Sequence, residues 1–359
     1  MFTRHRSHIA LALLFLIGGL YSTGCNIVKK ESKTPTLLKV EEATQAFLMS
    51  EVNRFARVDS MRAKMDLKFE DNSFAQFGSK EVYRSADGEI VVQRPANILL
   101  KVQVPVIKTD VAQMTSDGEK FQVAILQDGG SGKYKKFVIG TNSADYSRLQ
   151  RELDANNGDN AVRENVNAFA NLRPQHFTDA MLVRPTDDAH YYTQSTIYQI
   201  EEDITQDRKS PLRVVNRGYY LLDEFARTAD GGLQITRRFW FDRVAKIRLA
   251  RQQLFDARGE IESDITYGRE GTLTDTGDYR NLPLQIIVTR PLDKYSMRLT
   301  YKAPEAVVIG HEFPATAFVL QNSWNLDVLD LDKELQEATA AAVPAQPANK
   351  PPSNASRYQ

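Results

Sequence analysis

Hydrophobic and polar residues alternate along much of this chain. The clearest run is SMRAKMDLKFED, residues 60–71, whose odd positions are apolar: Met61, Ala63, Met65, Leu67 and Phe69. Charged residues occupy nearly all of the even positions between them. A period of two with one polar face is typical of an antiparallel strand that is buried on one side. The run therefore predicts a half-buried strand.

Similar runs follow at short intervals, separated by turn signals. Asp117-Gly118, Asp230-Gly231 and Arg258-Gly259 each lie between alternating runs, and we place a further turn at Ala86-Asp87-Gly88. Such dipeptides between strands are a strong hairpin signal. The pattern predicts antiparallel strands before Ser143 and again from near Tyr191. We expect one continuous sheet rather than two separate domains.

Helical periodicity occurs in three places. Apolar residues recur at helical spacing from Leu37 to Val58, with Thr34 as a possible cap and Pro35 at the first helical position. A polar, helix-rich insertion covers residues 143–188, and a short helix is plausible over 326–342. The tail, residues 343–359, is rich in Pro, Ala, Asn and Ser, so we expect it to be disordered.

The N-terminus has the layout of a bacterial secretory signal. Arg4 and Arg6 precede a short apolar run, Ile9 to Tyr21, and the small residues 22–24 lead to Cys25, the only cysteine of the chain. A signal that ends in this way resembles the lipoprotein type, in which the thiol is acylated and the chain is cut before it. The expectation is a signal over 1–24, lipidation of Cys25 and a tether over 25–36. The alternative is an ordinary signal that leaves a stray cysteine.

Composition excludes some classes of function. The 359 residues carry 46 basic and 46 acidic side chains, and removal of the signal leaves about two net negative charges. No basic patch interleaved with aromatic residues stands out, so we expect no nucleic-acid partner. A single cysteine rules out an internal disulfide. No second hydrophobic run reaches membrane-spanning length.

Motifs for catalysis or metal binding are missing from the sequence. His176, His190 and His311 have no metal-ligand spacing, so we expect neither a metal nor a cofactor. A phosphate loop at QDGGSGKY fails because Gln127 replaces the first glycine and Tyr134 replaces the Ser or Thr. We interpret His176 as a hydrogen-bonded structural residue and find no positive sign of an enzyme.

The order of elements resembles the LolA/LolB lipoprotein-carrier superfamily. A helix and a strand precede Arg-Pro-x-x-Ile-x-Leu (Arg94 to Leu100), then Pro105-Val106, then Ser-Asp-Gly-x-x-Phe (Ser116 to Phe121). The later strands up to Lys302 are also similar to the closing strands of such proteins. The resemblance covers about Leu37 to Leu320, within an expected domain over 37–325.

This resemblance implies a mainly β (α+β) fold. It consists of a curved antiparallel sheet, an unclosed barrel, with helices over an apolar concave face that holds acyl chains. The residues expected to line a lipid-binding cavity are Met61, Met65, Leu67, Ile98, Leu100, Val102, Val104, Phe121, Val123, Met297 and Leu299. Met114, Tyr295 and Tyr301 are further candidates, because methionine in particular adapts to irregular ligands. The alternative is that these side chains simply pack against the helices.

Two functions remain open at this point. The first is a membrane-anchored protein that binds lipid or lipoprotein acyl chains and acts as acceptor or carrier in lipoprotein sorting. We expect it at the periplasmic face of the outer membrane, with Val106 and Ile107 as a candidate hydrophobic loop or, equally, as core residues. The second is a structural or regulatory envelope lipoprotein that binds a protein partner. A hydrolase is the weakest hypothesis.

Overall fold

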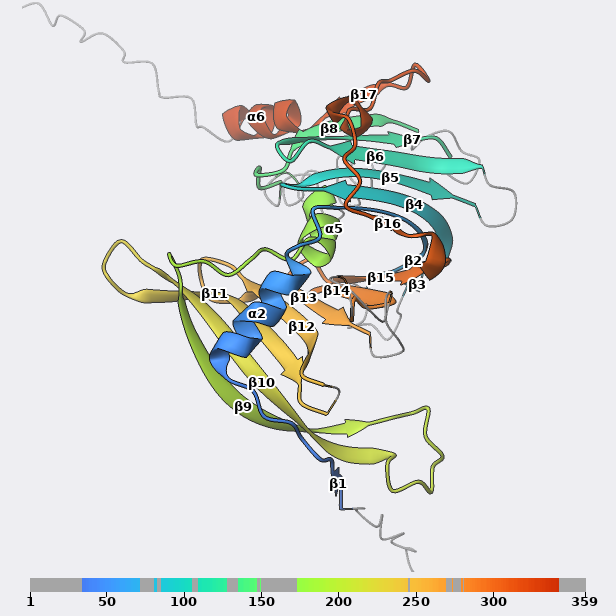
Figure 1. Ribbon diagram of the computed structural model, residues 1–359. Helices are drawn as coiled ribbons and strands as arrows, with labels where there is room; N and C mark the ends of the chain where they lie inside the picture. Colours follow the sequence, from blue (N-terminus) through green and yellow to red (C-terminus); the bar gives the residue numbers. More distant parts are fainter. Residues whose placement is uncertain are drawn as a thin grey trace, which may run out of the picture. The chain divides into compact units, whose positions relative to one another are not determined.

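Strands dominate the computed structural model of the protein (Figure 1). The structure describes residues 34–71, 81–82, 85–104, 109–127, 135–146, 149, 173–244, 246–268, 273, 279 and 281–341. Several predictions lie outside these residues. They are the signal over 1–24, Cys25, the tether up to residue 33, Val106, Ile107, most of the 143–188 insertion and the 343–359 tail.

The elements before residue 182 form a first series. They are β1 (Thr36–Leu37), α2 (Gln45–Phe55), β2 (Ser60–Asp71), β3 (Glu81–Val82), β4 (Ala86–Gln93), β5 (Asn97–Gln103), β6 (Asp110–Ser116), β7 (Lys120–Ile125), β8 (Phe137–Thr141) and α5 (Pro174–Met181).

The second series begins with the longest strands. It comprises β9 (Tyr191–Glu202), β10 (Val214–Arg227), β11 (Leu233–Asp242), β12 (Arg248–Phe255), β13 (Ile261–Tyr267), β14 (Gln285–Arg290), β15 (Tyr295–Tyr301), η2 (Pro304–Ala306), β16 (Val308–Ile309), η3 (Ala315–Phe318), β17 (Val328–Asp330) and α6 (Leu331–Ala341).

The chain divides into two compact units. The smaller unit contains residues 1–37 and 200–216, and the larger unit contains 38–199 and 217–359. In the smaller unit, β1 pairs in parallel with the first residues of β10, Thr36 with Val215 and Leu37 with Asn216. Because β9 and β10 continue into the larger unit, the chain crosses between the units within strands.

The larger unit is built on one antiparallel sheet. Its neighbours run β10, β11, β12, β13, β14, β15, β2, β4, β5, β6, β7 and β8, and β17 adds a short parallel pair at β8. The strands curve (Figure 1), and β9 pairs with β10. The mainly β fold with one curved sheet left open is therefore confirmed.

Strand β2 shows how the alternation creates a core. Met61, Met65 and Leu67 are at most 3% exposed, whereas Arg62 and Lys64 between them are exposed. Strands on both sides of β2 add their own inward residues, so one face of the sheet carries a continuous apolar cluster. We call this side of the sheet in the larger unit the inner face.

Two local predictions were wrong. The helix expected over Leu37 to Val58 begins only at Gln45, because Thr44 is the residue that caps it: its Oγ1 accepts a hydrogen bond from the Phe47 amide at 3.3 Å. The segment before the cap is not helical, and the Glu41 amide donates to the Arg243 carbonyl at 2.9 Å.

The second error concerns the turn expected at Ala86-Asp87-Gly88, which lies inside β4 and pairs with Met65 to Leu67. Gly88 serves packing there. A Cβ atom on it would lie 2.6 Å from Leu67 Cδ1, closer than real contacts allow. At the other predicted turns, Gly118, Gly231 and Gly259 have φ between +78° and +96°, a conformation that favours glycine.

Candidate functional site

The inner face brings most of the predicted lining residues together. Nine of them are buried members of one apolar cluster: Met61, Met65, Leu67, Ile98, Leu100, Phe121, Val123, Met297 and Leu299. Val102 is partly buried against the same cluster, and Val104 is partly buried at the end of β5. The residues are thus gathered on one surface, and their role in ligand binding stays a prediction.

Helices α2 and α5 pack on this inner face (Figure 1). Helix α2 contributes Leu48, Val52 and Phe55 to the apolar cluster and contacts β12. Helix α5 contributes Phe177, Ala180 and Met181 and contacts β4, β5, β6 and β14. These helices have only 11 and 8 residues, so a small part of the chain covers the apolar surface.

Arg94, which follows β4, joins the ends of both helices. Its Nη2 donates to the Ala56 carbonyl at the end of α2 (2.9 Å) and to the Val183 carbonyl just after α5 (2.8 Å). Burial of the guanidinium lowers the pKa of Arg94, and the nearby Asp59 carboxylate partly opposes this. We call this pair of hydrogen bonds the Arg94 bridge. It connects the end of α2 to the segment that follows α5.

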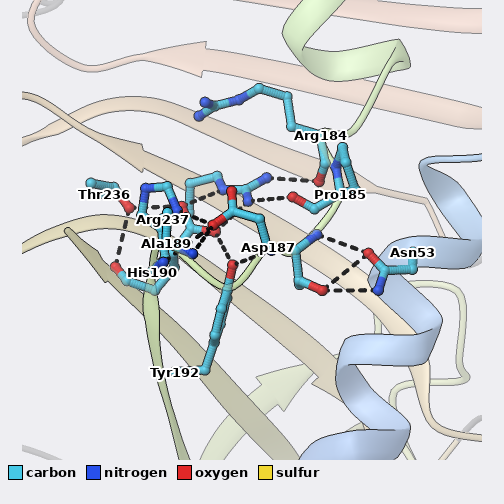
Figure 2. Close-up of polar contacts among 11 residues, drawn as sticks. Asn53, Arg184, Pro185, Asp187, Ala189, His190, Tyr192, Thr236 and Arg237 are labelled. Carbon is cyan, nitrogen blue, oxygen red and sulfur yellow. Dashed lines mark hydrogen bonds and ion pairs between the residues drawn. The ribbon is translucent and has the colours of Figure 1, made fainter.

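Residues 182–190, which link α5 to β9, form the second set of contacts (Figure 2). The Asn53 side chain exchanges hydrogen bonds with Thr186: Nδ2 donates to Thr186 Oγ1 at 2.9 Å, and Oδ1 accepts from the Thr186 amide at 2.8 Å. The Asp187 amide donates to Tyr192 Oη at 3.1 Å. We call residues 182–190 the connector. It is tied to α2 on one side and to β9 on the other.

A buried ion pair holds the connector to the sheet (Figure 2). Arg237 in β11 donates from Nη1 to the Arg184 carbonyl (2.8 Å) and from Nη2 to the Pro185 carbonyl (2.9 Å). Its Nε donates to Glu224 Oε1 at 2.7 Å, and both side chains are at most 2% exposed. The buried guanidinium of Arg237 therefore supplies hydrogen bonds to two carbonyl groups of the connector.

Glu224 is stabilised as an anion despite its burial. Tyr192 Oη and Thr236 Oγ1 donate to it at 2.9 and 2.8 Å, in addition to Arg237. Burial on its own would raise the pKa of Glu224, but the hydrogen bond and charge of Arg237 together with these hydroxyls lower it below its usual value. The cluster is a paired polar region on the inner face.

Helix α5 carries a carboxyl group of different character. Burial raises the pKa of Asp179 to about 6, and Arg184 opposes the effect. Nearby, Tyr267 Oη donates to the Ala180 carbonyl at 3.2 Å, and Tyr295 Oη is hydrogen-bonded to His176 Nδ1. Asp179 thus has a raised pKa on a helix that covers the inner face.

Sequence reasoning missed the buried arginines. Arg237 and Arg248 lie in β11 and β12 and are only 1% and 6% exposed, whereas arginines on strands are mostly exposed. Arg237 has the parity of Phe239 and Phe241 in the same strand, and this period-two spacing could have revealed its inward position. Among the described residues, no group of three or more His, Cys, Asp or Glu could hold a metal.

Comparisons with known proteins give similar solved structures at low sequence identity. No protein-family model and no curated protein matches the chain. Among solved structures it is similar to a LolA superfamily protein from Nitrosomonas europaea, with 10% identity over 78% of this chain and 99% of that one and a TM-score of 0.39. It is also similar to a putative outer membrane lipoprotein-sorting protein domain from Vibrio parahaemolyticus, with 11% identity, 77% and 97% coverage and a TM-score of 0.37.

A DUF1329 family protein from Desulfovibrio piger is a third similar structure. It shares 9% identity over 77% of this chain and 95% of that one, with a TM-score of 0.42. All three likenesses are at low identity and concern the fold. None of the helices in the described part of the chain is long and apolar enough to cross a membrane.

Proposed function

We propose that this protein binds the acyl chains of a lipid or lipoprotein on its inner face, as a non-enzymatic protein of the bacterial cell envelope. The observation that carries the proposal is the composition of that face. Four methionines, Met61, Met65, Met114 and Met297, lie within its apolar cluster. Unbranched, polarizable methionine side chains repack readily around irregular apolar ligands. The face therefore suits a flexible hydrocarbon chain.

The energetics favour exchange of a helix for a ligand. Displacing α5 exposes two large apolar side chains and one alanine, Phe177, Met181 and Ala180, at a cost of roughly 4–7 kcal/mol. An acyl chain of about 16 carbons gains roughly 12 kcal/mol on full burial, at about 0.8 kcal/mol per methylene. Even partial burial of such a chain therefore offsets the loss of the α5 contacts.

Opening of the inner face follows from the contacts that close it. The Arg94 bridge joins the end of α2 to the connector, and the Asn53–Thr186 hydrogen bonds repeat that link. We infer that these contacts break when a ligand enters between α2 and α5. The Glu224–Arg237 ion pair then keeps the connector attached to the sheet during the movement.

The proposed location rests on the N-terminus. Acylation of Cys25 would anchor the chain firmly, since several acyl chains together hold a protein that one alone holds only marginally. We propose an anchored acceptor or carrier in lipoprotein sorting at the periplasmic face of the outer membrane. Asn26 follows the cysteine. An aspartate at this position would favour the inner membrane, so Asn26 favours the outer membrane.

Ligand binding is tested with the purified full-length chain. Native mass spectrometry would identify lipid that copurifies with it, and titration with a fluorescent fatty acid would measure affinity. Leu100→Asn places an amide on the inner face, and we expect it to weaken binding at least tenfold. Lys101→Asn on the opposite side of β5 is the matched control and should bind normally.

Two results decide between the open hypotheses. Unfolding curves must first show that both variants are folded. Equal fatty-acid binding by folded Leu100→Asn and Lys101→Asn would exclude the inner face as the site. A chain that carries no lipid, binds no fatty acid and copurifies with one protein would instead support the alternative of a protein-binding envelope lipoprotein.

A further inference from the structure

The smaller unit exposes a group of aliphatic side chains. Ile204 is 77% exposed, Ile200 69%, Leu37 67% and Leu212 46%. They come from the hairpin formed by the end of β9, the turn at residues 203–213 and the start of β10, together with β1 beside it. We call residues 200–216 the apolar hairpin. Single exposed aliphatic residues are ordinary, whereas these four lie together in one small unit of the chain.

Polar contacts fix the conformation of this hairpin. Arg213 donates from Nη1 to the carbonyls of Ile204 and Gln206, both at 2.7 Å, and from Nε to Glu202 Oε1 at 2.9 Å. Asp203 Oδ1 accepts hydrogen bonds from the Thr205 amide and hydroxyl at 2.9 and 2.6 Å. The exposed aliphatic groups therefore do not hold the turn together. They are presented to the surroundings by a turn that other groups stabilise.

The chain that leads to the predicted anchor is attached to the same hairpin. Thr36 pairs with Val215, and its Oγ1 donates to the Pro211 carbonyl at 2.7 Å. Cys25 lies 11 positions before Thr36, and a segment of that length spans at most about 40 Å even when fully extended. A lipid on Cys25 therefore keeps the smaller unit close to a bilayer surface.

We propose that the apolar hairpin is a membrane-contact element that inserts Ile204 and Leu212 into the bilayer interface. The proposal rests on the lipid anchor of the proposed function. Asp207, Arg208 and Lys209 at the tip of the hairpin are exposed and together carry one net positive charge, which favours contact with anionic phospholipid headgroups. Such a second attachment would orient the anchored protein relative to the membrane, because a lipid on a tether alone leaves it free to rotate.

The test uses the processed, anchored protein in nanodiscs of phosphatidylethanolamine and phosphatidylglycerol. Because acylation blocks Cys25, Asp207→Cys supplies a single free thiol at the hairpin tip for an environment-sensitive fluorophore. We expect a blue-shifted emission and quenching by doxyl-labelled lipid. The same label at Leu233→Cys, an exposed position at the start of β11, should show neither effect.

Removal of the aliphatic groups checks the cause of the contact. Adding Ile204→Ser and Leu212→Ser to the labelled chain should reduce lipid quenching at least fivefold, whereas Leu233→Ser with Leu292→Ser should leave it unchanged. Solvent-like emission from the label at residue 207 in anchored, folded protein would overturn the proposal. Fatty-acid binding is measured on the same samples and should not change. A parent protein that binds no fatty acid would count against the proposed function and not against membrane contact by the hairpin.

Discussion

Loss of the Arg94 bridge should make the inner face easier to open. We consider Arg94→Met, which keeps an unbranched side chain of similar length but removes all donors. The two short hydrogen bonds of Nη2, at 2.9 and 2.8 Å, are lost with it. The contact of Nη1 with the Leu182 carbonyl is 3.5 Å long and adds little.

The magnitude follows from the two hydrogen bonds. A hydrogen bond from a charged donor contributes roughly 1.5–3 kcal/mol, and partial burial of the guanidinium favours the lower end of that range. The pair is therefore worth about 3 kcal/mol to the closed arrangement. At 1.4 kcal/mol per factor of ten, the equilibrium shifts toward the open form roughly 150-fold.

Ligand affinity reports this shift. If only the open form binds, the apparent dissociation constant equals the intrinsic one divided by the open fraction. We therefore expect Arg94→Met to bind a fluorescent fatty acid at least tenfold more tightly than the parent, and Arg94→Lys to lie between them. Arg57→Met, an exposed arginine near the end of α2, is the control and should leave affinity unchanged. Unchanged or weaker binding by folded Arg94→Met would refute the assignment of the bridge as the closing contact.

Two further predictions concern buried charges. Arg237→Met should lower the free energy of unfolding by about 3–5 kcal/mol in urea titrations, because it leaves the Glu224 carboxylate buried without its counter-ion. The double variant Arg237→Met with Glu224→Gln should recover part of this loss. Strict additivity of the two single effects would argue against coupling between the two residues. Burial raises the pKa of Asp179 from 3.8 to about 6, so the folded state binds the proton more tightly than the unfolded state does. The stability that this proton binding contributes is fully present below pH 4 and is lost as the pH rises through 6. Asp179→Asn should therefore stabilise the protein at pH 8 by up to about 3 kcal/mol and have little effect at pH 4; an equal effect at both pH values would contradict the raised pKa.

Alternation predicted the sheet because it reports a property that each strand has on its own. In β2 and β15 every second residue is apolar, and these residues are buried except Phe69, which is partly buried. Which strands pair with each other could not be predicted in the same way. The pairing of Leu299 with Leu67 joins the two halves of the sheet, and nothing in either strand specifies the other.

The candidate site was only partly visible in the sequence for a related reason. Apolar lining residues can be predicted from the alternation within one strand. The contacts of Arg94 and Arg237 cannot, because their hydrogen-bond acceptors lie far away in the sequence. Arg94 acts through carbonyls at residues 56 and 183, and Arg237 through carbonyls at 184 and 185. Gly88 was read as a turn residue because sequence does not reveal that Leu67 lies against it.

The position of β2 in the sheet has a consequence for how the chain folds. Asp71 pairs with Tyr295, 224 positions later, so the sheet is joined across its middle by one of the most distant contacts in the molecule. Closing a loop of that length costs roughly 5 kcal/mol of chain entropy, which only the completed strand pairing and the core beneath it offset. Contacts of such high sequence separation slow folding. Until β15 pairs with it, β2 has an unpaired edge and its methionines lack their partners on that side. The nascent sheet therefore exposes its apolar face for as long as the C-terminal strands are missing.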